Sequence, residues 1–219
     1  MKKDIHKGIV EKFIKVVENF RNSQIITNED LKNHVRSNLH SWLQYALIQA
    51  GSEVGLLAVP EIKVRFSEPI DPKNYGLVNK KRKRHFSRVD VAFFDKNKNL
   101  TGISEVFTID EAHGALTTKE LAKVNHYWLT PRDSLIHLIQ HSAVKPQFVI
   151  LVTTLLRKAS KIAWKIGIKE IDEKLESNRD YYDYYNAFKK YWVKFKDEIE
   201  RKNVKVSLLI LNENGIEKC

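Results

Sequence analysis

The sequence predicts an α/β protein in which helices flank a mixed β-sheet. Three observations support this class: two helix-like patterns open the chain, three strand-like runs follow them, and a continuous apolar run comes later. A chain of 219 residues can form one domain with a sizeable core. We therefore expect a single domain over 1–219, with its core at about 28–155 and added C-terminal helices and a last strand at 156–219.

Two helices are expected before the first strand. From Asp4 to Phe20, apolar residues recur at helical spacing between lysines and glutamates, which predicts an amphipathic helix. Asn28 can cap a second helix, which should run to about Ala50 and stop at Gly51. The apolar face of this second helix comprises Leu31, Val35, Leu39, Trp42, Leu43, Ala46 and Leu47.

Three strand-like runs come after these helices. The first lies in VGLLAVPEIKVRF (54–66), where apolar and polar residues alternate after Pro60. The other two are VDVAFFD and LTGISEVFTI, separated by KNKN. Because KNKN favours a tight turn, we expect these two runs to form an antiparallel hairpin.

The second half of the chain combines predicted helices with two further strands. A helix is expected from about Lys119 to Leu129, followed by a short helix at SLIHLIQH. The run QFVILVTTL, preceded by Pro146, has the apolar character of a strand buried on both faces. Two long helices at about 158–176 and 180–202 then lead to a last strand, VKVSLLIL.

The charge of the chain indicates a polyanionic partner. There are 38 Lys and Arg against 27 Asp and Glu, for a formal net charge of +11. Solubility or thermostability is the alternative explanation of such a surface. The densest basic cluster is expected to bind DNA phosphates, with a localisation signal or a plain surface loop as alternatives. It comprises Lys80, Lys81, Arg82, Lys83, Arg84 and, after a short gap, Arg88.

Cysteine content and hydropathy bear on the compartment. The single cysteine, Cys219, can form no internal disulfide, so nothing indicates an oxidising compartment. No apolar run reaches the roughly 18 residues that span a bilayer. We expect a cytoplasmic protein without membrane association, and a viral origin is compatible with this expectation.

Two acids in the predicted hairpin are the strongest candidates for a functional site. Asp90 lies about seven residues before the turn near Asn97 and Glu105 about eight after it, so their carboxylates should reach the same height. Two carboxylates, a backbone carbonyl and a phosphate can hold Mg²⁺, with Mn²⁺ as a substitute. Such an ion can activate water for attack on the phosphate. The alternative is a structural pair of acids neutralised by Arg88 or a nearby lysine.

These residues resemble the PD-(D/E)XK nuclease superfamily over about Leu31 to Thr154. The resemblance implies a restriction-endonuclease-like core, similar also to Holliday-junction resolvases, with element order α-β-β-β-α-β and helices added at both ends. It implies that Asp90 is the first acid, that Glu105 is the second, and that the Val106 carbonyl is a further metal ligand. Because the motif is short, the order of the elements is an important second reason for the resemblance.

The chain departs from the superfamily pattern two residues after Glu105, where Phe107 replaces the usual lysine. Lys123, or Lys119 one turn before it, is the expected substitute that stabilises charge at the attacked phosphate. The alternative is that both lysines are simply solvated. Glu61 is a candidate for a further acid near the metal, and a solvent-facing strand position is the alternative for it.

The expected function is therefore that of a Mg²⁺-dependent DNA endonuclease, with branched or recombining DNA as a candidate substrate and a homodimer as a candidate assembly. One alternative is a nuclease-fold DNA-binding protein that is inactive because of Phe107. Another is an RNA-directed nuclease or binding protein, since the net charge permits RNA equally well.

Overall fold

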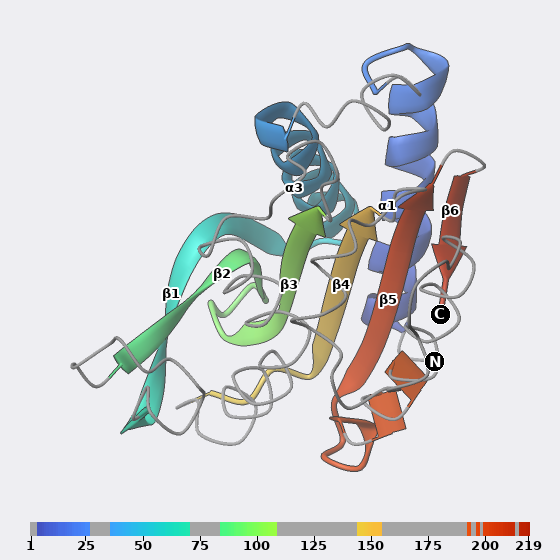
Figure 1. Cartoon of the computed structure of the whole chain (residues 1–219). Coiled ribbons are helices and arrows are strands. Elements are labelled where there is room, and N and C mark those ends of the chain that lie inside the picture. Colours follow the sequence, from blue (N-terminus) through green and yellow to red (C-terminus); the bar gives the residue numbers. More distant parts are fainter. Residues whose placement is uncertain are drawn as a thin grey trace, which may run out of the picture.

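The computed structural model describes residues 4–26, 36–70, 84–108, 144–154, 192–193, 196–197, 199–212 and 215–219. Two helices and six strands are described in this part of the chain (Figure 1). The helices are α1 (Ile5–Asn22) and α3 (Arg36–Glu53). The strands are β1 (Leu57–Ile70), β2 (Arg84–Phe94), β3 (Leu100–Thr108), β4 (Phe148–Thr154), β5 (Lys205–Asn212) and β6 (Gly215–Lys218).

The strands form one mixed sheet in the order β1-β2-β3-β4-β5-β6. Strands β1, β2 and β3 pair antiparallel, β4 is parallel to β3, β5 is parallel to β4, and β6 is antiparallel to β5. The sheet and its helices confirm the predicted α/β class.

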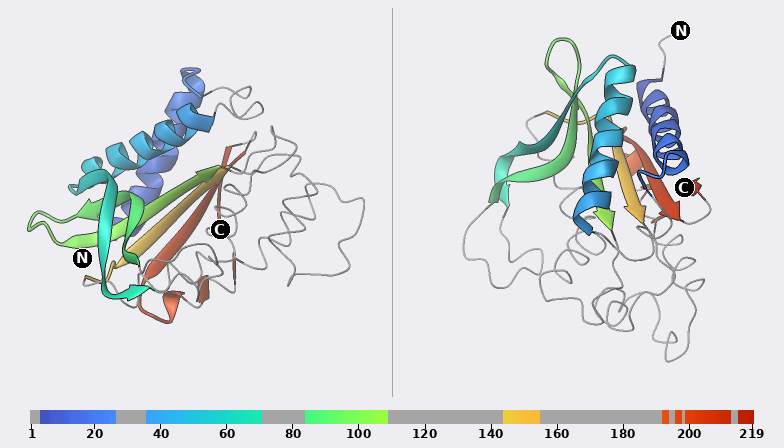
Figure 2. Two further views of the ribbon diagram at one scale, coloured as in Figure 1. Left: turned by 60° about the vertical axis from the view of Figure 1, so that its left-hand side comes forward. Right: turned by 90° about the horizontal axis from the view of Figure 1, so that it is seen from above.

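Both helices cover one face of the sheet (Figure 2). Helix α1 packs against α3, and α3 packs against β1, β2 and β3. The core between them combines helix residues such as Phe13 and Leu43 with strand residues such as Phe93, Ile150 and Leu209, all of them fully buried. Burying side chains of this size stabilises a fold by roughly 1.5–3 kcal/mol each, so this layer holds the sheet and the helices together.

The start of α1 matches its expected position, whereas the end of α3 does not. Asp4 caps α1 by accepting a hydrogen bond from the Lys7 N–H. Helix α3 continues past Gly51 to Glu53, and the chain reverses at Gly55, which has a φ of +85°. A Cβ at Gly51 would lie 2.8 Å from the Phe93 ring. This glycine therefore permits close contact between helix and sheet instead of ending the helix.

The predicted hairpin is confirmed, because β2 and β3 pair antiparallel around a turn at 95–99. The Asp95 carboxylate organises this turn by accepting hydrogen bonds from the N–H groups of Asn97 and Asn99, both at 2.8 Å. Lys98 adopts a left-handed φ of 63° in the same turn. The turn is centred near Asn97, as its sequence predicts.

The strands and helices predicted for the rest of the chain are confirmed in part. Strands at 148–154 and 205–212 confirm the predicted later strands, and β1 extends four residues beyond its expected end at 66. Strand β6 was not expected, because its four residues are too few to show alternation. The predicted helices at 119–129 and 158–176 lie outside the described residues. No described helix is both long and apolar enough to cross a membrane.

Candidate functional site

Asp90 and Glu105 lie side by side where the β2–β3 ladder ends. The last backbone pair of this ladder joins Val91 to Ser104, and the two acids are the next residues on their strands. Both are buried, with exposed fractions of 9% for Asp90 and 5% for Glu105. The register therefore agrees with the expectation that the hairpin brings these carboxylates to the same height.

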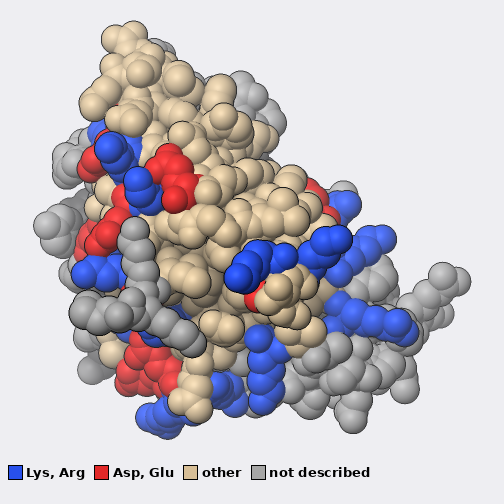
Figure 3. Space-filling model, turned by 180° about the vertical axis from the view of Figure 1, so that it is seen from behind, with Lys and Arg blue, Asp and Glu red and all other residues tan. Residues whose placement is uncertain are grey.

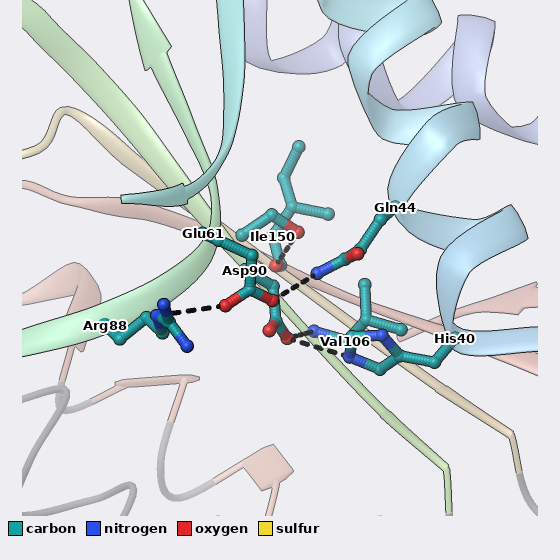
Figure 4. A network of polar contacts seen from close by, with 8 residues as sticks. His40, Gln44, Glu61, Arg88, Asp90, Val106 and Ile150 are labelled. Carbon is teal, nitrogen blue, oxygen red and sulfur yellow. Dashed lines mark hydrogen bonds and ion pairs between the residues drawn. The ribbon is translucent and has the colours of Figure 1, made fainter. Parts of the chain in front are cut away.

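The Asp90 carboxylate contacts a backbone group of β3 and a side chain of α3 (Figure 4). The Val106 N–H donates a hydrogen bond of 2.6 Å to Oδ2, and His40 Nε2 lies 3.5 Å from the same oxygen. Because the backbone ladder stops at Ser104, this side chain satisfies an N–H group of β3 that would otherwise be buried without a partner. The carboxylate also shares a side-chain hydrogen bond with Glu105.

The buried side chain of Glu105 lacks, in the described structure, a hydrogen bond that a carboxyl group normally makes. Within the described residues, its Oε2 atom is buried without a hydrogen-bond partner. Burial raises the pKa of Glu105 well above its ordinary value, and the charge of Asp90 and a side-chain hydrogen bond with that residue raise it further. The pair therefore favours a bound proton or a bound cation between its two carboxylates.

Glu61 lies near this pair and has its own partners. Gln44 Nε2 donates a hydrogen bond of 3.0 Å to Glu61 Oε1, and Arg88 Nε lies 3.1 Å from Glu61 Oε2. Arg88 is thus paired with Glu61 among the described residues. One alternative for the buried acids was a structural pair neutralised by Arg88. The described ion pair of Arg88 does not support it, because it involves neither Asp90 nor Glu105.

Two polar residues of α3 contribute to this region and were missed in the sequence. His40 and Gln44 are four residues apart, so they lie on one side of the helix, toward Asp90 and Glu61 respectively (Figure 4). The available signal was a pair of polar residues one turn apart between the apolar Leu39, Leu43 and Leu47. Sequence spacing does not show which strand residues such a pair will meet.

The donors fit a hard divalent cation only in part. No group of three or more His, Cys, Asp or Glu side chains within the described ranges could hold a metal ion. The buried, unpartnered Glu105 Oε2 beside Asp90 nevertheless matches the oxygen chemistry that Mg²⁺ prefers. The rest of the coordination would have to come from a backbone carbonyl, water and substrate. Val106 adjoins the pair through its N–H contact with Asp90.

Several residues of the predicted site lie outside the part of the chain that the structure describes. Lys119 and Lys123 lie outside the described residues, as does the basic run 80–83. Arg84 begins β2 and Phe107 lies in β3, but the described parts of these two residues do not include their side chains. Arg88 is the one member of the predicted phosphate-binding cluster whose side chain is described.

Fold and site together define an α/β protein with a buried pair of carboxylates on two adjacent strands of a mixed sheet. Comparisons of the chain with protein-family models, curated proteins and solved structures find no match.

Proposed function

We propose that this chain is a Mg²⁺-dependent DNA endonuclease with a PD-(D/E)XK-type core. The observation that carries the proposal is the Glu105 carboxylate, buried beside Asp90 with one oxygen lacking a partner in the described structure. Two adjacent buried acids are costly unless they bind a proton or a cation. Support for the core comes from the sheet, in which three antiparallel strands are followed by one parallel to the third.

In this proposal each described residue has a defined role. Asp90 is held through Oδ2 by the Val106 N–H and faces His40, so its carboxylate is fixed before substrate arrives. Glu105 supplies the second carboxylate from β3. A bound Mg²⁺ would polarise the scissile phosphate and lower the pKa of an attacking water. The Val106 carbonyl is proposed as a further ligand.

The proposed substrate is DNA, because a formal net charge of +11 favours a polyanion. The described part of the helix-covered face carries Lys, Arg, Asp and Glu side chains intermixed around a broad uncharged area (Figure 3). The described part of that face therefore offers no uniformly basic surface for a duplex. We propose that DNA approaches from the side of the acid pair, where Arg88 is exposed.

One observation favours a second candidate, a DNA-binding protein that keeps the core without cleavage. Phe107 stands two residues after Glu105, where the resembled superfamily has lysine. A site without that cation would stabilise charge at the attacked phosphate poorly unless another residue supplies it. Cleavage assays separate these two candidates.

The test is cleavage of plasmid and branched DNA with Mg²⁺ or Mn²⁺, comparing wild type with Asp90→Ala, Glu105→Ala and Lys123→Ala. We expect both acid variants to lose metal-dependent cleavage, by about 100-fold or more, since each removes a charged ligand. Lys123→Ala reports whether that lysine replaces the missing one. Asp95→Ala is the matched control, because Asp95 lies on the same hairpin and only organises the turn. DNA binding without cleavage by any of these proteins would instead establish the second candidate.

A further inference from the structure

A chain of three side chains borders the acid pair and links α3 to two strands. Gln44 of α3 donates to Glu61 Oε1, and Glu61 Oε2 pairs with Arg88 Nε of β2, at 3.0 and 3.1 Å (Figure 4). Each carboxylate oxygen of Glu61 thus has a described partner on another element. This arrangement suits Glu61 to hold the Arg88 side chain in place.

The backbone of Glu61 also departs from that of an ordinary strand residue. Its φ is +56°, in the left-handed region that non-glycine residues rarely adopt, although it lies inside β1 between Pro60 and Ile62. A conformation of this kind persists only where the surrounding structure holds it. The contacts with Gln44 and Arg88 are the described interactions of its side chain.

Arg88 is well placed to contact a substrate. Alternate residues of a strand point to the same face, so Arg88 shares a face of β2 with Asp90, two residues later. Its side chain is 63% exposed. The contact with Glu61 uses Nε, so within the described structure the two terminal amino groups can still bind a phosphate. A guanidinium offers two parallel donors to phosphate oxygens, which an ammonium cannot match.

We infer that Glu61 is a positioning residue that, supported by Gln44, orients the Arg88 guanidinium to bind a DNA phosphate beside Asp90 and Glu105. This inference rests on the proposed function. Arg88 would also supply the cation that is missing at Phe107. That cation would come from the neighbouring strand β2 and not from the helix that the sequence predicts around Lys123. An exposed ion pair contributes little to stability, so orientation is the reason for this pairing.

The experiment combines a double-mutant cycle with a metal titration. It compares wild type, Glu61→Ala, Glu61→Gln, Arg88→Ala and the double variant Glu61→Ala/Arg88→Ala. Three quantities are measured: the cleavage rate, the Mn²⁺ affinity, and the salt dependence of DNA binding in EDTA. Lys12 and Glu53 form a matched control pair, exposed to a similar degree on the two helices and joined at 2.9 Å.

We expect Glu61→Ala to lower cleavage about tenfold, as is typical of residues that orient a functional group. Glu61→Gln should largely restore cleavage, because an amide oxygen can still accept a hydrogen bond from Arg88 Nε. Mn²⁺ affinity should stay within about twofold of wild type in both variants, whereas Asp90→Ala abolishes it. In the Arg88→Ala background, Glu61→Ala should have no further effect on cleavage.

Two outcomes would overturn the inference while the nuclease proposal stands. The first is a loss of Mn²⁺ affinity in both Glu61 variants, which would make Glu61 a metal ligand. The second is additive losses from Glu61→Ala and Arg88→Ala, which would mean that the two residues act independently.

If the wild type cleaves no DNA, the nuclease proposal fails and DNA binding decides the inference alone. Loss of one phosphate contact lowers the slope of log affinity against log salt by about 0.9. Arg88→Ala should show this change, Glu61→Ala should reproduce it, and the double variant should show no more. An unchanged slope in Arg88→Ala, or equal changes in the Lys12→Ala control, would reject the inference.

Discussion

At the scale of single residues, the main feature is a carboxyl group in surroundings that solvate its ionised form poorly. Glu105 is buried next to Asp90, and both effects raise its pKa well above the ordinary value of 4.5. The folded protein therefore binds the Glu105 proton more tightly than the unfolded chain does. The free energy of unfolding of the metal-free protein should fall as the pH rises from about 4.5 through the folded-state pKa.

Glu105→Gln should remove this dependence, because an amide does not ionise. At pH 8 in EDTA we expect the variant to be more stable than wild type by about 1–3 kcal/mol, the usual cost of a buried polar group without a partner. At pH 5 the difference should shrink. Urea denaturation at both pH values measures it.

Asp95→Asn is the control for this prediction. Hydrogen bonds from Asn99 lower the pKa of Asp95, so its stabilising effect is present above its ordinary pKa and is lost only as the pH falls through the lowered value. This variant should therefore leave the pH dependence between 5 and 8 unchanged. A Glu105→Gln variant with the same pH dependence as wild type would contradict the assignment of that dependence to Glu105.

At the scale of elements, the sheet depends on close contact between β3 and β4. These strands pair in parallel, with Gly102 opposite Phe148. The Phe148 ring lies over the glycine and also contacts Phe93, with ring centroids 5.5 Å apart. The glycine is thus required by its neighbour across the sheet, which lies 46 residues later in the chain.

Gly102→Ala should destabilise the protein by about 1–3 kcal/mol, the usual cost of adding a methyl group to a packed core. The physical reason is that the new Cβ would lie 2.1 Å from the Phe148 ring, so the ring must move. Thermal or urea unfolding measures the loss. Adding Phe148→Ala should make the Gly102→Ala substitution nearly neutral, and a full additive loss in the double variant would show that the ring is not responsible.

At the scale of the whole molecule, the proposed metal site couples binding to folding. The two acids come from strands that lie together only in the folded sheet, so a cation should bind the folded chain preferentially. Ligand at a hundred times its dissociation constant stabilises a protein by about 2.7 kcal/mol. The proposed nuclease should therefore be more resistant to heat when the metal is present.

We expect the midpoint of thermal unfolding to rise with added Mg²⁺ or Mn²⁺ in wild type and not in Asp90→Ala or Glu105→Ala. NaCl at matched ionic strength controls for charge screening. An equal rise in both acid variants would place the metal elsewhere. No rise in wild type at millimolar metal would count against a metal site at this pair.

Local patterns in the sequence determined much of this fold. The apolar spacing of 4–20, the turn residues around Asn97 and the apolar run before Thr154 correspond to a helix, a hairpin and a buried strand in the structure. Asp90 and Glu105 could be paired in advance because a tight turn fixes the register of a hairpin. Each of these inferences depends on interactions between residues close in the sequence.

Only the tertiary structure decided which distant residues complete the site. His40 and Gln44 meet the strand acids because α3 packs across β1, β2 and β3. Gly51 lies within the helix, where the Phe93 ring leaves no room for a Cβ. The left-handed backbone of Glu61 and its pairing with Arg88 depend likewise on neighbours from other elements. Spacing and composition describe one segment at a time, whereas these contacts arise from packing between segments that the sequence separates by tens of residues.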